Sequence, residues 1–333
     1  MGRHEILIKP LPPHKNVYLA FFLYSFALGA IFPRLGDLQL QMQIGESALG
    51  LAIMGLPLGV QISLLFADKL TDKLGFKLIL AMGLPALSVF LTLACYVLEP
   101  INFFLYLLFG GFVVGLLEVA VNLEADRVEY KLERRIMNRS HAFWSLGFFV
   151  SGFLGALMSQ WEIVPFYHLL VFGSVSTFAV LVFLINYRPA KFRPNLKENN
   201  SLFVKPTPEI LVLVVFTLSA MLVEGAGIDW SVIFMRDIFA TPAAFNGLAL
   251  AFGALSQFFV RYFADDLIEK HGSEKIARLS ITLMLFGVFM VCFSQQAYIA
   301  LIGFIFMGAG NAVLFPMAVS AAAQKTDRPA AVN

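Results

Sequence analysis

FADKLTDKLG, at Phe66–Gly75, returns as FADDLIEKHG at Phe263–Gly272, an offset of 197 residues. Phe, Ala, Asp, Leu, Lys and Gly match in order, and each copy separates two apolar runs. A short charged turn at the same place in two hydrophobic halves indicates an internally duplicated membrane protein. Such internal repeats are typical of transporters.

The composition fits a chain whose solvent is the lipid bilayer. Hydrophobic residues make up 59% of the chain and charged residues 14%, and the mean hydropathy is +0.79. A water-soluble core cannot enclose so much apolar surface. We therefore expect an all-α membrane protein that is a monomer, with a small-molecule substrate, protons and lipid as partners and no nucleic acid.

The apolar runs predict ten membrane-spanning helices, since most of them reach the ~20 residues that a span needs. The expected spans are Val17–Pro33, Ser47–Phe66, Leu78–Leu98, Ile101–Leu123, His141–Gln160, Val164–Tyr187, Ile210–Ile233, Phe245–Phe263, Ile276–Phe293 and Tyr298–Ala322.

Lys and Arg define an orientation for these spans. With the N-terminus in the cytoplasm, 22 of the 24 basic residues fall on the inner side, and only Arg34 and Arg236 fall outside. Cytoplasmic loops of membrane proteins carry such an excess. We therefore expect a multi-pass protein of a bacterial inner membrane with a cytoplasmic N-terminus.

The repeat also predicts the domain organisation. A six-helix half spans 1–187, a basic and proline-containing cytoplasmic linker spans 188–208, and the second half spans 209–333 with four helices. Adding the offset to His141 gives position 338, past the last residue. We therefore expect a twelve-helix fold that stops after its tenth helix. The alternative is a truncated, non-transporting remnant of such a permease.

The first charged turn carries a family resemblance. ADKLTDKLGFK (Ala67–Lys77), with Asp68, Asp72, Gly75 and Lys77 in its pattern, resembles the hallmark loop of the major facilitator superfamily. Four further segments are similar to the fucose-permease-like subgroup: GLLEVAVNLEADRVE (Gly115–Glu129), MNRSHAFWSLG (Met137–Gly147), IDWSVIFMRD (Ile228–Asp237) and GAGNAVLFP (Gly308–Pro316). The resemblance implies two six-helix halves that alternate access to a central site, with the four loop residues in conformational gating.

Glu118 is the candidate for proton coupling. It lies in an apolar span, and an acid at membrane depth usually faces a cavity or a partner. The alternative is an acid near the cytoplasmic end with a structural role. The resemblance aligns Glu118 with a proton-coupling glutamate, with Asn122 in the same small motif. Fucose–proton symport in that subgroup also uses an essential aspartate in the first helix. The first span here has no acid, since Asp37 follows Pro33 and is expected in the outer loop.

Further polar residues inside spans are candidates for the substrate pathway: Asn122, Tyr24, Glu224, Gln257 and Asn311. Glu224 precedes Gly225-Ala226-Gly227, and glycines inside a long span predict a broken helix like those that line transporter sites. Asn311 and Pro316 predict an irregular tenth helix.

Two basic residues have competing interpretations. Arg261 is either a partner of the gating acids Asp68 and Asp72 or an ordinary residue at the membrane interface. His141, beside Arg139, invites a proton-relay interpretation, but its position favours the interface.

The sequence argues against an enzyme. An intramembrane enzyme needs a nucleophile–base pair or a metal set, and neither spacing is visible, nor is a phosphate loop. We expect no cofactor and no metal. The sequence predicts a secondary active transporter that moves a small polar organic solute, such as a sugar, by proton-coupled alternating access.

Overall fold

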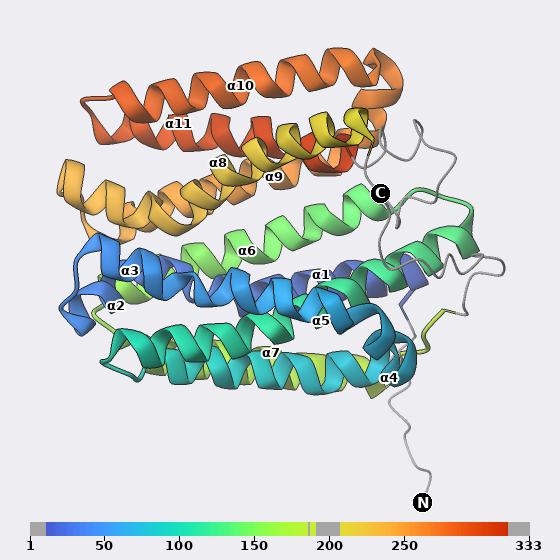
Figure 1. The fold of residues 1–333 in the computed structure, drawn as a ribbon, viewed down its shortest axis with the longest axis horizontal. Coiled ribbons are helices and arrows are strands. Elements are labelled where there is room, and N and C mark those ends of the chain that lie inside the picture. The colour runs from blue at the N-terminus through green and yellow to red at the C-terminus, as the bar shows by residue number, and fades with distance from the viewer. Residues whose placement is uncertain (1–10, 186, 191–206, 319–333) are drawn as a thin grey trace, which may run out of the picture.

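The structure is a computed structural model that describes residues 11–185, 187–190 and 207–318. The described residues form helices joined by short turns (Figure 1). The elements are α1 (Pro13–Gly29), η1 (Phe32–Arg34), α2 (Leu35–Met42), α3 (Glu46–Ile53), α4 (Gly55–Ala94), α5 (Pro100–Leu132), α6 (Met137–Gln160), α7 (Pro165–Ile185), α8 (Pro208–Phe239), α9 (Ala243–His271), α10 (Ser273–Phe293) and α11 (Ala297–Asn311).

The predicted number of spans agrees with this arrangement. Nine stretches of the described residues are long and apolar enough to cross a membrane, and one of them, Glu46–Ala94, has 49 residues. Gly75 divides that stretch, because its φ of 77° and ψ of 154° are not helical. The stretch therefore contains both the second and the third expected span.

The two copies of the repeated segment fold alike. Gly75 has φ 77° and Gly272 has φ 82°, a left-handed backbone that glycine adopts without steric cost. Both turns lie at the same end of the bundle (Figure 1). The duplication read from the sequence is therefore also a duplication of backbone geometry.

The first span is longer than predicted. The helical path continues from α1 through η1 and α2 to Met42, so the expectation that Asp37 lies in an outer loop is wrong. Pro33 sits in the first turn of η1, where its missing N–H removes no helical hydrogen bond. Asp37 then occupies the first turn of α2, where the helix dipole favours an acid.

The predicted break after Glu224 is also wrong. Helix α8 runs without interruption through Gly225 and Gly227. Glycine can adopt helical dihedral angles as well as others, so its presence does not require a break. The irregularity predicted for the tenth span is present instead: α11 ends at Asn311, a turn follows at Ala312 and Val313, and helix resumes at Leu314.

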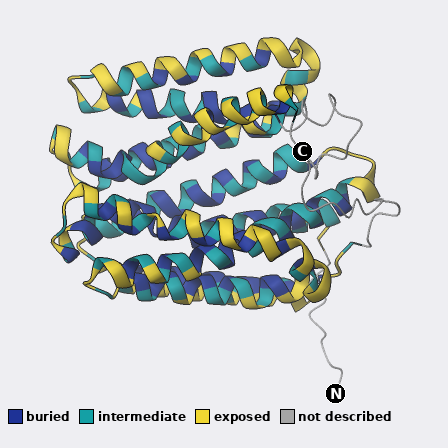
Figure 2. Ribbon diagram, in the orientation of Figure 1, coloured by how far each residue is buried: buried dark blue, intermediate teal, exposed yellow. Residues whose placement is uncertain are grey.

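Burial follows the geometry of a membrane bundle. Figure 2 shows buried residues concentrated on inner helices such as α1 and exposed ones on peripheral helices such as α10. Many exposed residues are large and apolar, with Phe178 and Phe293 both 71% exposed. Such faces suit lipid contact. Within the bundle, α4 packs on α5 at glycines: a Cβ on Gly59 would lie 2.0 Å from the Leu108 carbonyl oxygen.

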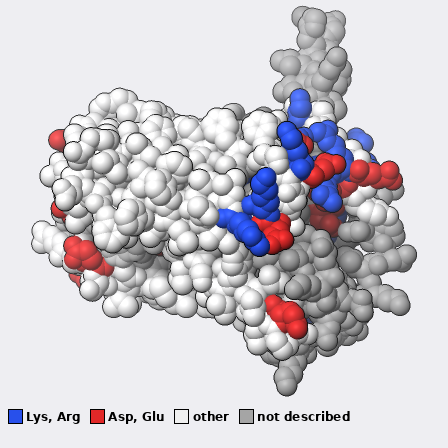
Figure 3. All heavy atoms as spheres, turned by 90° about the horizontal axis from the view of Figure 1, so that it is seen from above, with Lys and Arg blue, Asp and Glu red and all other residues white. Residues whose placement is uncertain are grey.

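Charge is distributed along the bundle as the sequence predicts. On the face seen in Figure 3, Lys and Arg gather toward one end, the middle is uncharged, and the other end shows only acids. The basic end also holds the turns at Gly75 and Gly272 (Figure 1). An uncharged band between two charged ends is the pattern of a protein that spans a bilayer.

Candidate functional site

Glu118 lies within α5, where the next turn supplies its first polar partner. Asn122 Nδ2 donates to Glu118 Oε1 at 3.0 Å and to the Glu118 carbonyl oxygen at 2.9 Å. The spacing of four residues places the two side chains on one face of the helix. The two hydrogen bonds fix the orientation of the Glu118 carboxyl group within an apolar helix.

Two neighbouring helices complete the surroundings of Glu118. His141 Nε2, from α6, lies 3.1 Å from Asn122 Oδ1. Because Asn122 uses its amide hydrogens on Glu118, His141 must carry its hydrogen on Nε2. From α1, the buried Tyr24 lies within hydrogen-bonding reach of Glu118. α6 begins at Met137, so His141 lies one turn into the helix, and its position at the membrane interface stays a prediction.

A second polar group gathers around Glu224 on α8. Gln257 Nε2 donates to Glu224 Oε1 at 2.7 Å, and Arg261 NH2 lies 3.5 Å from the same oxygen. Both partners come from α9, one turn apart. Arg261 is only 9% exposed and pairs with Glu224, so neither interpretation offered by the sequence holds.

Ser145 on α6 joins the two groups. Arg261 NH1 donates to Ser145 Oγ at 2.7 Å, and Ser145 Oγ donates to the His141 carbonyl oxygen at 3.2 Å. Two hydrogen-bonded groups, one at the His141 ring and one at the His141 carbonyl, are therefore joined through the covalent bonds of His141 and connect Glu118, in the first predicted half, to Glu224, in the second. Sequence reasoning missed Ser145, which has no local signal. It underrated Arg261, although a cation inside the apolar run 258–263 is itself a signal of function.

A pocket lies beside these groups at the boundary between the halves. It is lined by the aromatic rings of Trp144, Phe148 and Phe304 and by the polar side chains of Glu224, Gln257 and Asn311. Asn311 Oδ1 is buried and has no hydrogen-bond partner among the described residues, whereas Trp144 lies within hydrogen-bonding reach of Tyr24. Three of the five predicted pathway residues therefore share this pocket, while Tyr24 and Asn122 belong to the group around Glu118.

The residues of the first charged turn that are predicted to take part in gating lie at the basic end. Asp72 Oδ1 is 3.6 Å from Arg127 NH2, and Arg127 NH1 is 4.0 Å from Glu124. Glu124 is fully buried and accepts hydrogen bonds from the Tyr187 hydroxyl and, at 2.7 Å, from the Ala190 N–H. Asp72 is thus connected to the start of the linker within the first half.

The other predicted gating residues differ in what they contact. Asp68 and Lys77 are exposed, and Gly75 makes the turn. Contacts between the halves come from the second copy: Asn138 donates to Asp265 at 2.6 Å, and Arg139 lies 3.8 Å from Asp266. In the described part of the chain, the acids of the repeat seen to contact the other half are therefore Asp265 and Asp266, and gating by Asp68 and Asp72 stays a prediction.

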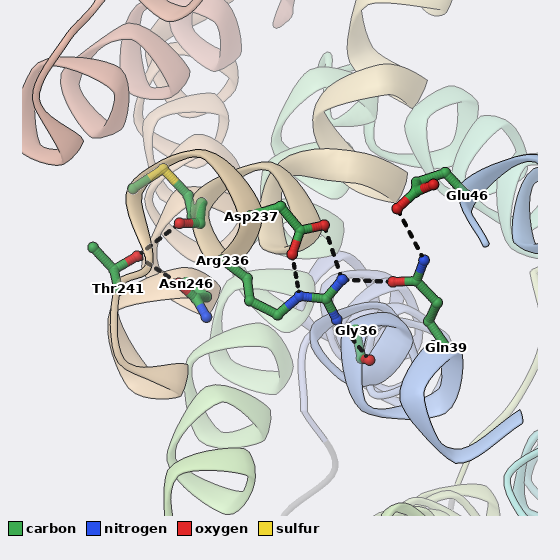
Figure 4. Close-up of polar contacts among 8 residues, drawn as sticks. Gly36, Gln39, Glu46, Arg236, Asp237, Thr241 and Asn246 are labelled. Atoms are coloured by element: carbon green, nitrogen blue, oxygen red, sulfur yellow. Dashed lines mark hydrogen bonds and ion pairs between the residues drawn. The ribbon is translucent and has the colours of Figure 1, made fainter. Parts of the chain in front are cut away.

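Arg236 joins the halves at the opposite end of the bundle (Figure 4). From α8, its NH1 donates to the Gly36 carbonyl oxygen at 2.9 Å and its NH2 to Gln39 Oε1 at 2.6 Å, both on α2. Asp237 holds the guanidinium through Nε at 2.6 Å. Gly36 permits this approach, since a Cβ there would lie 3.3 Å from NH1. We call this arrangement the Arg236 contact.

Known membrane transporters are similar to this chain over most of its length. A model of the Major Facilitator Superfamily matches residues 17–333. An uncharacterized transporter, y4wD, of Sinorhizobium fredii is 26% identical over 322 residues, which cover 96% of this chain and 85% of that protein. An uncharacterized MFS-type transporter of Yersinia pestis is 23% identical over 329 residues, covering 98% and 85%.

Solved structures share the fold at low sequence identity. A variant of the nucleoside transporter NupG matches with a TM-score of 0.72 and 15% identity, over 96% of this chain and 85% of that one. FucP in its outward conformation matches with a TM-score of 0.64 and 16% identity, over 94% and 84%. A D-xylose-proton symporter matches with a TM-score of 0.67 and 12% identity, over 93% and 86%. At these identities the likeness concerns the fold.

Proposed function

Because the chain belongs to the major facilitator superfamily, and is therefore a membrane transporter and not an enzyme, we propose that it moves a small polar organic solute by proton-coupled alternating access. A sugar is the first solute to test, and a bacterial inner membrane with the basic end in the cytoplasm is the proposed setting. The two halves rock about the pocket between them.

The observation that carries the proposal is Glu118 with its two partners. A carboxyl inside an apolar helix, held by Asn122 and within reach of Tyr24, is a group that can bind and release a proton at membrane depth. The contacts of His141, Ser145 and Arg261 give Glu118 a structural connection to the pocket. A protonation change at Glu118 can therefore alter the balance between the two conformations of the bundle.

The pocket supports a polar solute. Three aromatic rings supply flat apolar surfaces, and Glu224, Gln257 and Asn311 supply hydrogen-bonding groups, the mixture that small-molecule sites use. The unpartnered Asn311 Oδ1 calls for a hydrogen-bond donor, which a hydroxyl group of a sugar provides.

The test is uptake by purified protein in liposomes, screened with radiolabelled L-fucose, D-xylose and nucleosides, with and without a pH gradient. For the solute that is taken up, Glu118→Gln is expected to abolish gradient-driven accumulation. Exchange of solute across the membrane needs no net proton movement, so it is expected to survive, because Gln keeps the shape of Glu and some of its hydrogen bonding. Accumulation by Glu118→Gln in response to a pH gradient would place coupling elsewhere, with Glu224 next to test. Absence of both uptake and exchange in the parent chain would favour the non-transporting remnant.

A further inference from the structure

A groove lies at the basic end of the bundle, between α1, α6 and the end of α9. Its volume is about 510 Å³, and we call it the α1–α6 groove. Three cations line it: Lys15 on α1, Arg134 in the turn before α6 and Arg139 in the first turn of α6. No acidic side chain lines it in the part of the chain that the structure describes. The charges of the groove therefore favour an anion as its occupant.

The three cations of the groove are available to a ligand. Lys15 and Arg134 are exposed, and neither forms an ion pair with a described residue. Arg139 NH2 lies 3.8 Å from Asp266 Oδ2, and its guanidinium lies 5.4 Å from the centre of the Tyr262 ring. Asp266 is 66% exposed, and ion pairs that water reaches contribute little to stability. An anion can therefore bind these cations without breaking a strong contact.

The walls of the groove are two helix faces with the same spacing of residues. On each helix, a cation is followed after four and seven residues by apolar side chains: Lys15, Leu19 and Phe22 on α1, and Arg139, Phe143 and Leu146 on α6. Such spacing keeps each set on one face of its helix. Seven residues of α-helix rise about 10 Å, so the apolar walls extend about 10 Å from the cations toward the middle of the bundle.

The groove opens away from the pocket between the halves. Ser145 Oγ accepts a hydrogen bond from Arg261 between the halves, and Ser145 follows Phe143 by two residues. Two residues apart in an α-helix point in nearly opposite directions, so the wall at Phe143 faces the outside of the bundle. Phe143 stacks on Tyr18 of α1 at 4.8 Å, which joins the two walls. The occupant therefore enters from the surrounding bilayer.

We propose that the α1–α6 groove binds an anionic phospholipid of the leaflet at the basic end. Its phosphate lies among Lys15, Arg134 and Arg139, and one acyl chain lies along the apolar walls. Basic pockets between membrane helices recognise lipid head groups in this way. A soluble anion would use the cations and leave the apolar walls uncovered. Because Arg139 contacts Asp266 and Tyr262 of the second predicted half, the lipid binds where the two halves meet.

The first test compares two lipids on the parent chain. The full chain in detergent is titrated with phosphatidylglycerol or with phosphatidylcholine of the same acyl chains, and native mass spectrometry counts the bound lipid. One molecule of phosphatidylglycerol is expected to bind before any other. Phosphatidylcholine, which has no net charge, is expected to bind at least about tenfold more weakly, since each nearby cation favours an anionic lipid. Equal binding of the two lipids would overturn the proposal.

The second test uses matched charge variants. Lys15→Gln/Arg134→Gln is expected to weaken binding of phosphatidylglycerol at least about tenfold, whereas Lys15→Arg/Arg134→Lys keeps both charges and should bind like the parent chain. Lys270→Gln/Lys275→Gln removes the same charge from exposed positions at the same end and should leave binding unchanged. A similar loss in both glutamine pairs would indicate general attraction to the basic end and would overturn the groove as the site.

The third test separates a lipid from a soluble phosphate compound. Glycerophosphoglycerol carries the head group of phosphatidylglycerol without its acyl chains, so it cannot cover the apolar walls. In large excess over the lipid, it is expected to leave the bound phosphatidylglycerol in place, because burial of each acyl CH₂ adds about 0.8 kcal/mol to the affinity of the lipid. Displacement by glycerophosphoglycerol would assign the groove to soluble anions instead. This test also uses the parent chain, so it decides even if a variant folds poorly.

Discussion

At the scale of single residues, ion pairs in this protein differ in how completely the membrane bundle encloses them. Arg34 is 2% exposed, and its Nε donates to Asp37 at 2.6 Å while its NH2 donates to the Ile163 carbonyl. Ser159 adds a hydrogen bond to Asp37 at 2.8 Å. Arg278 and Glu274 form an equally short pair at 2.5 Å, but their side chains are 78% and 79% exposed.

Asp37→Ala is expected to lower the free energy of unfolding by about 3 kcal/mol, because it leaves a buried guanidinium without its counter-charge. Glu274→Ala removes a pair of the same geometry from an exposed turn, and its effect is expected to stay below about 1 kcal/mol. Unfolding in mixed detergent micelles measures both. Similar losses for the two variants would mean that burial does not decide the contribution of the Arg34 pair.

At the scale of helices, close contact between α4 and α5 depends on residues without a side chain. A Cβ on Gly111 would lie 2.0 Å from the Leu56 carbonyl oxygen, closer than any real contact. Small residues let membrane helices approach until their backbones touch. Gly225 on α8 offers the matched case, since a Cβ there would meet nothing within 4 Å.

Gly111→Ala is expected to destabilise the protein by about 1–3 kcal/mol, because the two backbones must separate. Gly225→Ala makes the same chemical change in open space, where the higher helix propensity of alanine is worth up to about 1 kcal/mol in the other direction. Thermal unfolding of the two variants in the same detergent gives the comparison. A loss of stability in Gly225→Ala equal to that in Gly111→Ala would contradict the packing argument.

At the scale of the whole molecule, the Arg236 contact joins the halves at the end opposite the basic one. Its two hydrogen bonds to α2 hold that end closed, and each is worth about 1 kcal/mol or more, since the donor is charged. Arg236→Gln is therefore expected to shift the conformational balance toward an opening at that end by at least about tenfold.

The measurement is labelling of Ser231→Cys, a buried position on α8, in a chain whose Cys95 and Cys292 are replaced. A membrane-impermeant thiol reagent added to intact cells should react several-fold faster in Arg236→Gln. Arg278→Gln, which breaks an exposed pair on one helix at the other end, should leave the rate unchanged. No increase of the labelling rate in Arg236→Gln would show that other contacts close this end. Because the reagent reaches the protein only from outside the cell, faster labelling also supports the proposed orientation, with the basic end in the cytoplasm.

The number of spans and the repeat were predictable because their signals lie along the chain, whereas the extension of the first span to Met42 was not. Apolar runs gave the spans, the repeated segment gave the two equivalent turns, and an acid among apolar neighbours gave Glu118. The site was predictable only in part. Glycines suggested a break in α8, yet glycine permits a break without requiring one, and the chain stays helical. The partners of Arg261 lie 37 to 116 residues away in sequence, so only packing could reveal them.

In a continuous helix the Ala312 carbonyl would accept from the N–H of residue 316, but Pro316 has none, and Arg261 Nε donates to this carbonyl at 3.0 Å instead. This hydrogen bond has a consequence for the insertion of the chain into the membrane. The donor lies 51 residues before the acceptor, so α9 leaves the ribosome and enters the membrane well ahead of the turn at Pro316. Without a donor, the Ala312 carbonyl would enter the lipid unpaired. The side chain of Arg261 is already in the membrane when this carbonyl is inserted. The order of synthesis thus protects the least regular point of the tenth span, and a chain rearranged so that α11 is made before α9 would insert that point unprotected.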